Sequence, residues 1–114
     1  MGRRHMWTSA AIAGVLLAGP ALAQDAPAGD AAAGHRIAAG ICQSCHGMDG
    51  LPKLPDMPTI AGSAASYLER QLAAYRSGER QNEMMSAVAP MLDDQKAADV
   101  AAYYAAMRVT SQPP

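Results

Sequence analysis

Two cysteines and a histidine stand together in the segment Cys42-Gln43-Ser44-Cys45-His46. Two thiols at this spacing lie about one helical turn apart, so both can add to the vinyl groups along one edge of a porphyrin. The histidine that follows then lies beneath the ring, where an imidazole nitrogen can bind the iron. The pentapeptide therefore predicts one covalently attached haem c, held by Cys42 and Cys45, with His46 as an axial ligand of the iron.

The two cysteines could also have three less specific roles. A structural zinc site needs four nitrogen or sulfur ligands, and outside the first 23 residues only His35 could join the three in the motif. A redox dithiol of the thioredoxin type needs a βαβ context, which the composition does not favour. A plain disulfide between Cys42 and Cys45 is the simplest alternative.

The iron also needs a ligand on its other face, and a methionine thioether could supply it. Met48 is too close to His46 in the chain to cross the ring, and Met107 belongs to the predicted last helix. Met84 and Met85 follow a predicted helix end and a polar turn, so we expect them on a segment free to approach the other haem face. One of these two is the predicted sixth ligand, and most other methionines should fill the core. The methionines considered are Met48, Met57, Met84, Met85, Met91 and Met107, with His35 as a second possible imidazole.

The first half of the predicted domain contains one helix and one long loop. Asp30 should cap a helix from Ala31 to about Ile41, because its carboxylate can accept hydrogen bonds from the free amides of the first turn. Three prolines and a glycine exclude a helix between Met48 and Ile60, which is predicted to be a loop.

Two further helices are predicted. Ser63 should cap a helix that runs to Ser77 and ends at the following glycine. Asp93 or Asp94 should cap the last helix, which runs to about Met107. The predicted inner stripe of that helix is Ala97, Val100, Ala101 and Tyr104.

The first 23 residues have the layout of a secretory signal. Two arginines precede an apolar run at Thr8–Ala18, and Pro20 precedes a small-x-small site that ends at Ala23. An uncleaved anchor over Met6–Ala23 is the alternative, although its length is near the lower limit for spanning a bilayer. Cleavage would place the two thiols in an oxidising compartment, where haem attachment would consume them.

Removal of these 23 residues leaves 91, which is enough for one domain. We expect a signal peptide at 1–23, a flexible lead-in at 24–29, the folded domain at 30–108 and a disordered tail at 109–114. Seven basic and ten acidic residues remain, and the formal charge of −3 argues against a nucleic-acid partner. Only eight β-branched residues and four tyrosines remain, so the fold should be all-α and the porphyrin should complete a small core.

The order of these motifs resembles a class I cytochrome c, most closely the single domain that is repeated in periplasmic dihaem cytochromes c. The resemblance covers roughly residues 29–107. It is carried by Cys42–His46, Gly47–Gly50, Pro58–Gly62, Tyr67–Leu72, Gly78–Met85, Leu92–Gln95 and Ala101–Tyr104. The chain departs from the family pattern at Lys96, where an acid is common, and at Tyr103-Tyr104, where one aromatic residue is common.

The resemblance implies a small all-α fold in which the N- and C-terminal helices pack around one covalently bound haem c. In that family the ligand methionine stands seven residues before the leucine that precedes the last helix. With Leu92 as that leucine, the implied ligand is Met85, with Met84 as the fallback. The family also implies that the Pro58 carbonyl binds the other ring nitrogen of His46.

Two polar residues before the methionines also match the family pattern. The resemblance implies that Arg80 and Asn82 lie near the haem propionates or the ligand loop. A solvated turn accounts for both residues equally well.

Two axial ligands leave no open position on the iron, so the resemblance implies electron transfer and not catalysis. The expected function is that of a soluble periplasmic carrier without stable membrane insertion. Its partners would be a reductase or dehydrogenase and a terminal oxidase or reductase. The alternatives are a cytochrome subunit of an exported dehydrogenase or oxidase, and a haem-based ligand sensor or peroxidase if Met85 dissociates.

An apolar lining of the haem and a partner-binding surface near it are also expected. Its apolar lining should comprise Ile37, Ile41, Leu54, Ile60, Leu68, Leu72, Val88 and Val100. Partners should bind near Gln43, Gly47–Leu51 and the Pro52–Met57 loop, where Leu51, Leu54 and Met57 would form a small apolar patch.

Overall fold

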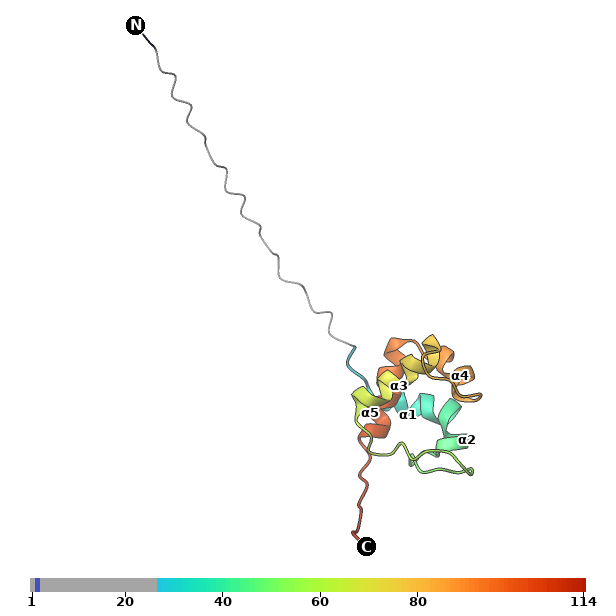
Figure 1. The fold of residues 1–114 in the computed structure, drawn as a ribbon. Coiled ribbons are helices and arrows are strands. Elements are labelled where there is room, and N and C mark those ends of the chain that lie inside the picture. Colours follow the sequence, from blue (N-terminus) through green and yellow to red (C-terminus); the bar gives the residue numbers. More distant parts are fainter. Residues whose placement is uncertain (1, 3–26) are drawn as a thin grey trace.

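The computed structural model describes Gly2 and residues 27–114, so the predicted leader apart from Gly2 and the first half of the lead-in, residues 24–26, lie outside the described residues. The described part is all-α, as predicted, and contains no strand. No helix in this part has the length and apolar character needed to cross a bilayer. The elements in chain order are α1 (Ala31–Ile37), the π-helical η1 (Ala38–Cys42), α2 (Gln43–His46), α3 (Ala65–Ser77), α4 (Met85–Val88), the 3₁₀ segment η2 (Ala89–Met91) and α5 (Asp94–Ala105) (Figure 1).

The first helix begins as predicted, but the helical path that it starts ends later than predicted. The Asp30 carboxylate accepts hydrogen bonds from the backbone amides of Ala32 and Ala33, at 2.8 and 3.3 Å. The predicted end near Ile41 is wrong, because the helical path continues through η1 and α2. No proline or left-handed residue interrupts it before Gly47, whose φ of 72° ends α2.

The start of α3 also differs from the prediction. Ser63 does not cap this helix, since its amide closes a turn onto the Ile60 carbonyl at 3.3 Å. Ala64 is the residue before the helix, and it makes no side-chain cap. The predicted end is confirmed, because Gly78 follows Ser77 in a left-handed conformation with φ 82°.

The last helix packs directly on the first (Figure 1). Of the two predicted caps, Asp93 is the one that caps α5, through the Lys96 amide, and Asp94 is the first residue of the helix. Gly34 makes the contact possible, because a Cβ atom at this position would lie 2.0 Å from the backbone oxygen of Asp99. The predicted inner stripe of α5 is buried at Ala97, Val100, Ala101 and Tyr104.

A buried carboxylate connects the start of α1 to α5. Asp99 is 7% exposed. It accepts hydrogen bonds from the Asp30 amide at 2.8 Å and from Gln95 Nε2 at 2.9 Å. The Asp30 amide and then the Gln95 side chain hold the pKa of Asp99 below its usual value. The charged form of Asp99 therefore favours the folded state.

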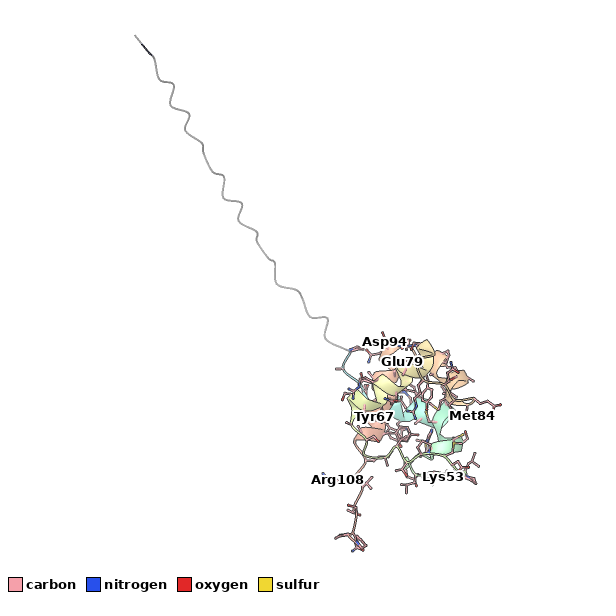
Figure 2. The ribbon with its side chains drawn as sticks, in the orientation of Figure 1. Lys53, Tyr67, Glu79, Met84, Asp94 and Arg108 are labelled. Carbon is pink, nitrogen blue, oxygen red and sulfur yellow. The ribbon has the colours of Figure 1, made fainter. Side chains whose placement is uncertain are left out.

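This depressed pKa predicts how stability depends on pH. The contribution of Asp99 is fully present above the unfolded-state pKa and is lost as the pH falls through the lower folded-state pKa. We expect Asp99→Asn to be less stable than wild type near neutral pH, with a difference that narrows toward about pH 3. Urea unfolding of the haem-loaded protein at several pH values measures this, with exposed Glu79→Gln as the control (Figure 2). A difference that is constant over the whole range would contradict it.

Candidate haem-binding site

The continuous path from η1 into α2 carries the three residues of the motif. Cys42 is the last residue of η1, and Cys45 and His46 lie in the single turn of α2. The Gln43 amide donates to the Ala38 carbonyl five residues earlier, which is the hydrogen bond of a π-turn. Such turns often occur at functional sites. Both cysteines are half-buried free thiols, and His46 is 8% exposed.

The hydrogen bond of His46 determines which of its ring nitrogens is free to bind a metal. Its Nδ1 atom lies 3.1 Å from the backbone oxygen of Pro58, twelve residues later. A carbonyl oxygen can only accept, so Nδ1 is the donor and the lone pair of the neutral ring remains on Nε2. This is the contact that the family resemblance implies for Pro58. An imidazole held in this way can present Nε2 to a metal.

The loop between His46 and Pro58 is closed by Gly50. Its carbonyl accepts hydrogen bonds from the amides of Ile60 and Ala61, at 2.9 and 3.2 Å. Its φ is 70°, and a Cβ atom there would lie 2.6 Å from the Ala61 amide nitrogen. A glycine is therefore needed for the loop to return and bring Pro58 to the histidine.

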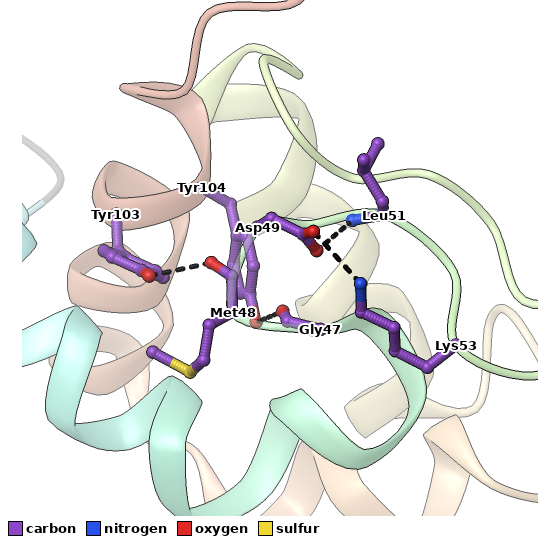
Figure 3. Close-up of polar contacts among 7 residues, drawn as sticks. All are labelled: Gly47, Met48, Asp49, Leu51, Lys53, Tyr103 and Tyr104. Atoms are coloured by element: carbon purple, nitrogen blue, oxygen red, sulfur yellow. Dashed lines mark hydrogen bonds and ion pairs between the residues drawn. The ribbon is translucent and has the colours of Figure 1, made fainter.

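Two adjacent tyrosines of α5 bind the chain directly after His46 (Figure 3). The Tyr103 hydroxyl donates to the Met48 carbonyl at 2.7 Å, and the Tyr104 hydroxyl donates to the Gly47 carbonyl at 2.9 Å. Tyr104 is 2% exposed. Its burial follows from the helical period of α5, but these hydrogen bonds do not, because no local pattern connects residues more than fifty positions apart.

A short polar turn continues from this point (Figure 3). The Asp49 carboxylate accepts hydrogen bonds from the Leu51 amide at 3.1 Å and from Lys53 Nζ at 3.0 Å. The Leu51 amide, followed by Lys53, lowers the pKa of Asp49. The turn after the motif is therefore bound both to α5 and within itself.

The environment of Cys42 does not suit a redox dithiol. Burial, and then the neighbouring Cys45, raise the pKa of the Cys42 thiol to about 11, although a hydrogen bond with Tyr104 opposes the shift. Burial also raises the pKa of the Tyr104 hydroxyl. Reactive dithiols have a thiol pKa below the usual value. Before any attachment, Cys42 is therefore a neutral thiol at physiological pH.

A zinc site gains no support from the described residues. They contain no group of three or more histidine, cysteine or acidic side chains arranged to hold a metal ion. His35, the extra ligand that a zinc site would need, is exposed on α1. Its ring packs edge-on against Tyr103, with 5.3 Å between ring centroids.

The two adjacent methionines differ in exposure. Met85 begins the short helix α4, and η2 follows. Met84 is 54% exposed and lies at the outer edge of the molecule (Figure 2). Met85 is half-buried. In Figure 1, α4 and the turn α2 that carries His46 lie one below the other at the same edge. The half-buried side chain of Met85 suits a buried ligand better than the exposed side chain of Met84.

Arg80 and Asn82 are exposed, as expected for a solvated turn, but each makes specific contacts with the protein. Arg80 Nη1 donates to Gln71 Oε1 at 2.7 Å, and its guanidinium lies 4.8 Å from the centre of the Tyr75 ring. The Asn82 side chain binds the backbone that leads into α4. Asn82 is a preferred helix-capping residue, and this was the available sequence signal for α4.

Most of the residues predicted to line the haem are buried or half-buried, with one correction. Leu54 is 49% exposed because its loop runs along the surface. Val100 is buried, and Val88 is half-buried. Partly buried side chains that pack against the core are Ile37, Ile41, Ile60, Leu68 and Leu72.

The protein side chains alone build only a small core. The largest fully buried side chains are Tyr104 and Leu92, and α3 fully buries none of its residues. Apolar residues of α1, η1 and α3 are thus only partly covered by protein. Two thiols, an imidazole with Nε2 free and these partly covered apolar faces fit a covalently bound haem.

Known proteins resemble this chain over most of its described length. The family model described as Cytochrome c matches residues 31–107. Cytochrome c-554(548) of Halomonas halodenitrificans is 44% identical over 68 residues, which cover 57% of this chain and 82% of that protein. A thiosulfate dehydrogenase electron acceptor of Stutzerimonas stutzeri is 36% identical over 102 residues, which cover 89% of this chain and 47% of that protein.

A solved structure has the same fold. Reduced recombinant cytochrome c4 from Pseudomonas stutzeri superposes with a TM-score of 0.65 at 34% identity, over 71% of this chain and 47% of that chain. This chain therefore spans most of the Halomonas relative and about half of the other two proteins.

Proposed function

This chain belongs to the cytochrome c family, and from that premise we propose that it is a periplasmic carrier of single electrons with one covalently bound haem c. Cys42 and Cys45 would hold the haem, and His46 and Met85 would bind its iron. Met84 is the alternative to Met85 as the sixth ligand. The observation that carries the proposal is the buried His46 ring, whose Nδ1 donates to Pro58 and leaves Nε2 free beside the two thiols. When bound, the haem supplies a one-electron Fe(III)/Fe(II) couple.

The protein residues would set the properties of this couple. The Pro58 carbonyl fixes the tautomer of His46 and raises its basicity. A methionine thioether favours the reduced iron more than a second imidazole does, which raises the reduction potential. Partly buried aliphatic side chains such as Leu68 and Leu72 would limit the access of water, which also disfavours the extra charge of the oxidised state.

The partner surface would lie on the loop after the motif. Leu51 and Leu54 are 44% and 49% exposed, and Met57 is half-buried. A small apolar patch of this kind suits a short-lived complex with a redox partner protein. The expected partners are a reductase or dehydrogenase on one side and a terminal oxidase or reductase on the other.

Covalent attachment is the first property to test. The full chain, produced in a host that attaches haem c, should remain haem-stained after denaturing electrophoresis. The double variant Cys42→Ala/Cys45→Ala should lose the stain, because no thiol remains to form a thioether. Met85→Ala is the matched control and should keep it. A colourless wild-type product that is still folded would exclude the proposal.

A second candidate is supported by the Stutzerimonas relative, whose name describes an electron acceptor of a dehydrogenase. This chain would then serve one exported dehydrogenase as a docked subunit. Co-purification with a larger catalytic subunit at constant stoichiometry would favour this function over that of a free carrier.

A further inference from the structure

The first turn of α4 is closed by contacts between Asn82 and Ser86. The Asn82 Oδ1 atom accepts hydrogen bonds from the backbone amides of Met84 and Met85, both at 3.0 Å. In return, Ser86 Oγ accepts a hydrogen bond from the Asn82 amide at 3.1 Å. The Ser86 amide donates to the Asn82 carbonyl at 2.8 Å. This reciprocal cap resembles a capping box. In a capping box the second side chain comes three residues after the cap, whereas Ser86 comes four residues after Asn82.

The helix that depends on this cap is very short. It has four residues, Met85–Val88, and a helix of this length does not form independently in water. Its first turn is therefore fixed by the cap and by packing. The first turn of a helix leaves several backbone amides without helical acceptors. Asn82 binds two of them, the amides of Met84 and Met85.

The position of the first turn decides which methionine points inward. Successive side chains on a helix point about 100° apart, so a shift of the turn by one residue would give Met84 the direction that Met85 now has and would turn Met85 away. In the observed position of the turn, which the cap stabilises, Met85 is half-buried and Met84 is 54% exposed.

We propose that Asn82 and Ser86 are positioning residues that select Met85 over Met84 as the axial ligand, by fixing the register of α4. The inference rests on the proposed function, because it takes Met85 as the ligand. Without the cap, a larger fraction of the molecules would have Met85 away from the iron. A competing ligand binds more tightly in proportion to that fraction.

A titration of the oxidised, haem-loaded protein with imidazole tests this effect. We expect Asn82→Ala to bind imidazole about tenfold more tightly than wild type, and Ser86→Ala about threefold more tightly. Asn82→Asp keeps an acceptor at the cap and should stay within about twofold of wild type. Ser86→Ala also provides the test if Asn82→Ala does not fold.

The matched control is Ser77→Ala at the end of α3. The Ser77 hydroxyl also binds backbone groups, namely the Ala74 carbonyl and the Glu79 amide, at 3.2 and 3.4 Å. Its loss should leave imidazole affinity unchanged, even if the unfolding temperature falls. Wild-type affinity in both Asn82→Ala and Ser86→Ala, or an equal rise in Ser77→Ala, would overturn the proposal.

Selection between the two methionines is tested by NMR of the reduced protein. The methyl group of a bound methionine is shifted far upfield by the ring current. Wild type should show one such signal and Asn82→Ala should show two, and the added Met84→Leu change should remove the second. A single signal in Asn82→Ala would overturn the selection of Met85.

The ligand assignment can fail separately from this inference. An upfield methyl signal that survives in Met85→Ala would refute Met85 as the ligand. Loss of that signal in Met85→Ala, combined with wild-type imidazole affinity in Asn82→Ala and Ser86→Ala, would refute the inference alone.

Discussion

Met85→Ala is expected to abolish the iron–thioether charge-transfer band of the oxidised protein and to lower its reduction potential. The band requires sulfur on the iron, and loss of the thioether removes a ligand that favours the reduced state. We expect the potential to fall by at least about 60 mV, which is a tenfold change in the equilibrium of a one-electron couple. Optical spectroscopy and a redox titration measure the two effects.

Met84→Ala is the control for this experiment. Met84 is 54% exposed, so its loss should leave the band in place and the potential nearly unchanged. Both variants keep Cys42 and Cys45 and should therefore remain haem-stained. A band that persists in Met85→Ala and is absent in Met84→Ala would assign the ligand to Met84 instead.

Gly34→Ala should strongly destabilise the fold. The added methyl group would lie 2.0 Å from the Asp99 backbone oxygen and 2.8 Å from the Tyr103 Cβ atom, so α1 and α5 must separate. We expect the free energy of unfolding to fall by about 3 kcal/mol, the upper range for overpacking a core. Urea unfolding of the haem-loaded protein, followed by circular dichroism, measures the change.

Gly40→Ala provides a matched control in the same continuous helical path. A Cβ atom at Gly40 has no neighbour within 4 Å. Its stability should be unchanged or higher by about 0.5–1 kcal/mol, because alanine loses less backbone entropy than glycine in a helix. Equal losses in the two variants would show that the helix contact is not the cause.

Several local features were predictable because each depends on residues within about one turn. Asp30 and Asp93 cap their helices as predicted, and Gly78 ends α3. The segment Cys42–His46 is likewise a local pattern, and its spacing alone predicts haem attachment. The inner stripe of α5 also follows from the helical period.

Other local predictions were wrong at positions where contacts with the rest of the fold determine the helix bounds or the burial of a side chain. The helical path runs past Ile41 to His46, and a turn onto Ile60 uses Ser63 before α3 begins. The short helix α4 at Met85 was not predicted, because no apolar period longer than one turn indicates it. Leu54 is apolar but exposed, because the path of its loop and not its hydropathy sets its burial.

The order of the amino acids was enough to predict the chemistry of this protein: two thiols and an imidazole at the spacing of a haem site, in a small helical domain with few aromatic residues. How that site is held depends on the packing of distant segments. The contact of His46 with Pro58 was expected from family resemblance and not from spacing, and the hydroxyls of Tyr103 and Tyr104 reach a turn far away in the chain. Spacing fixes geometry only within a turn or a short loop, because beyond that length the chain can take many paths. Contacts between distant segments, such as those of α5 with the turn after His46, therefore depend on the tertiary packing.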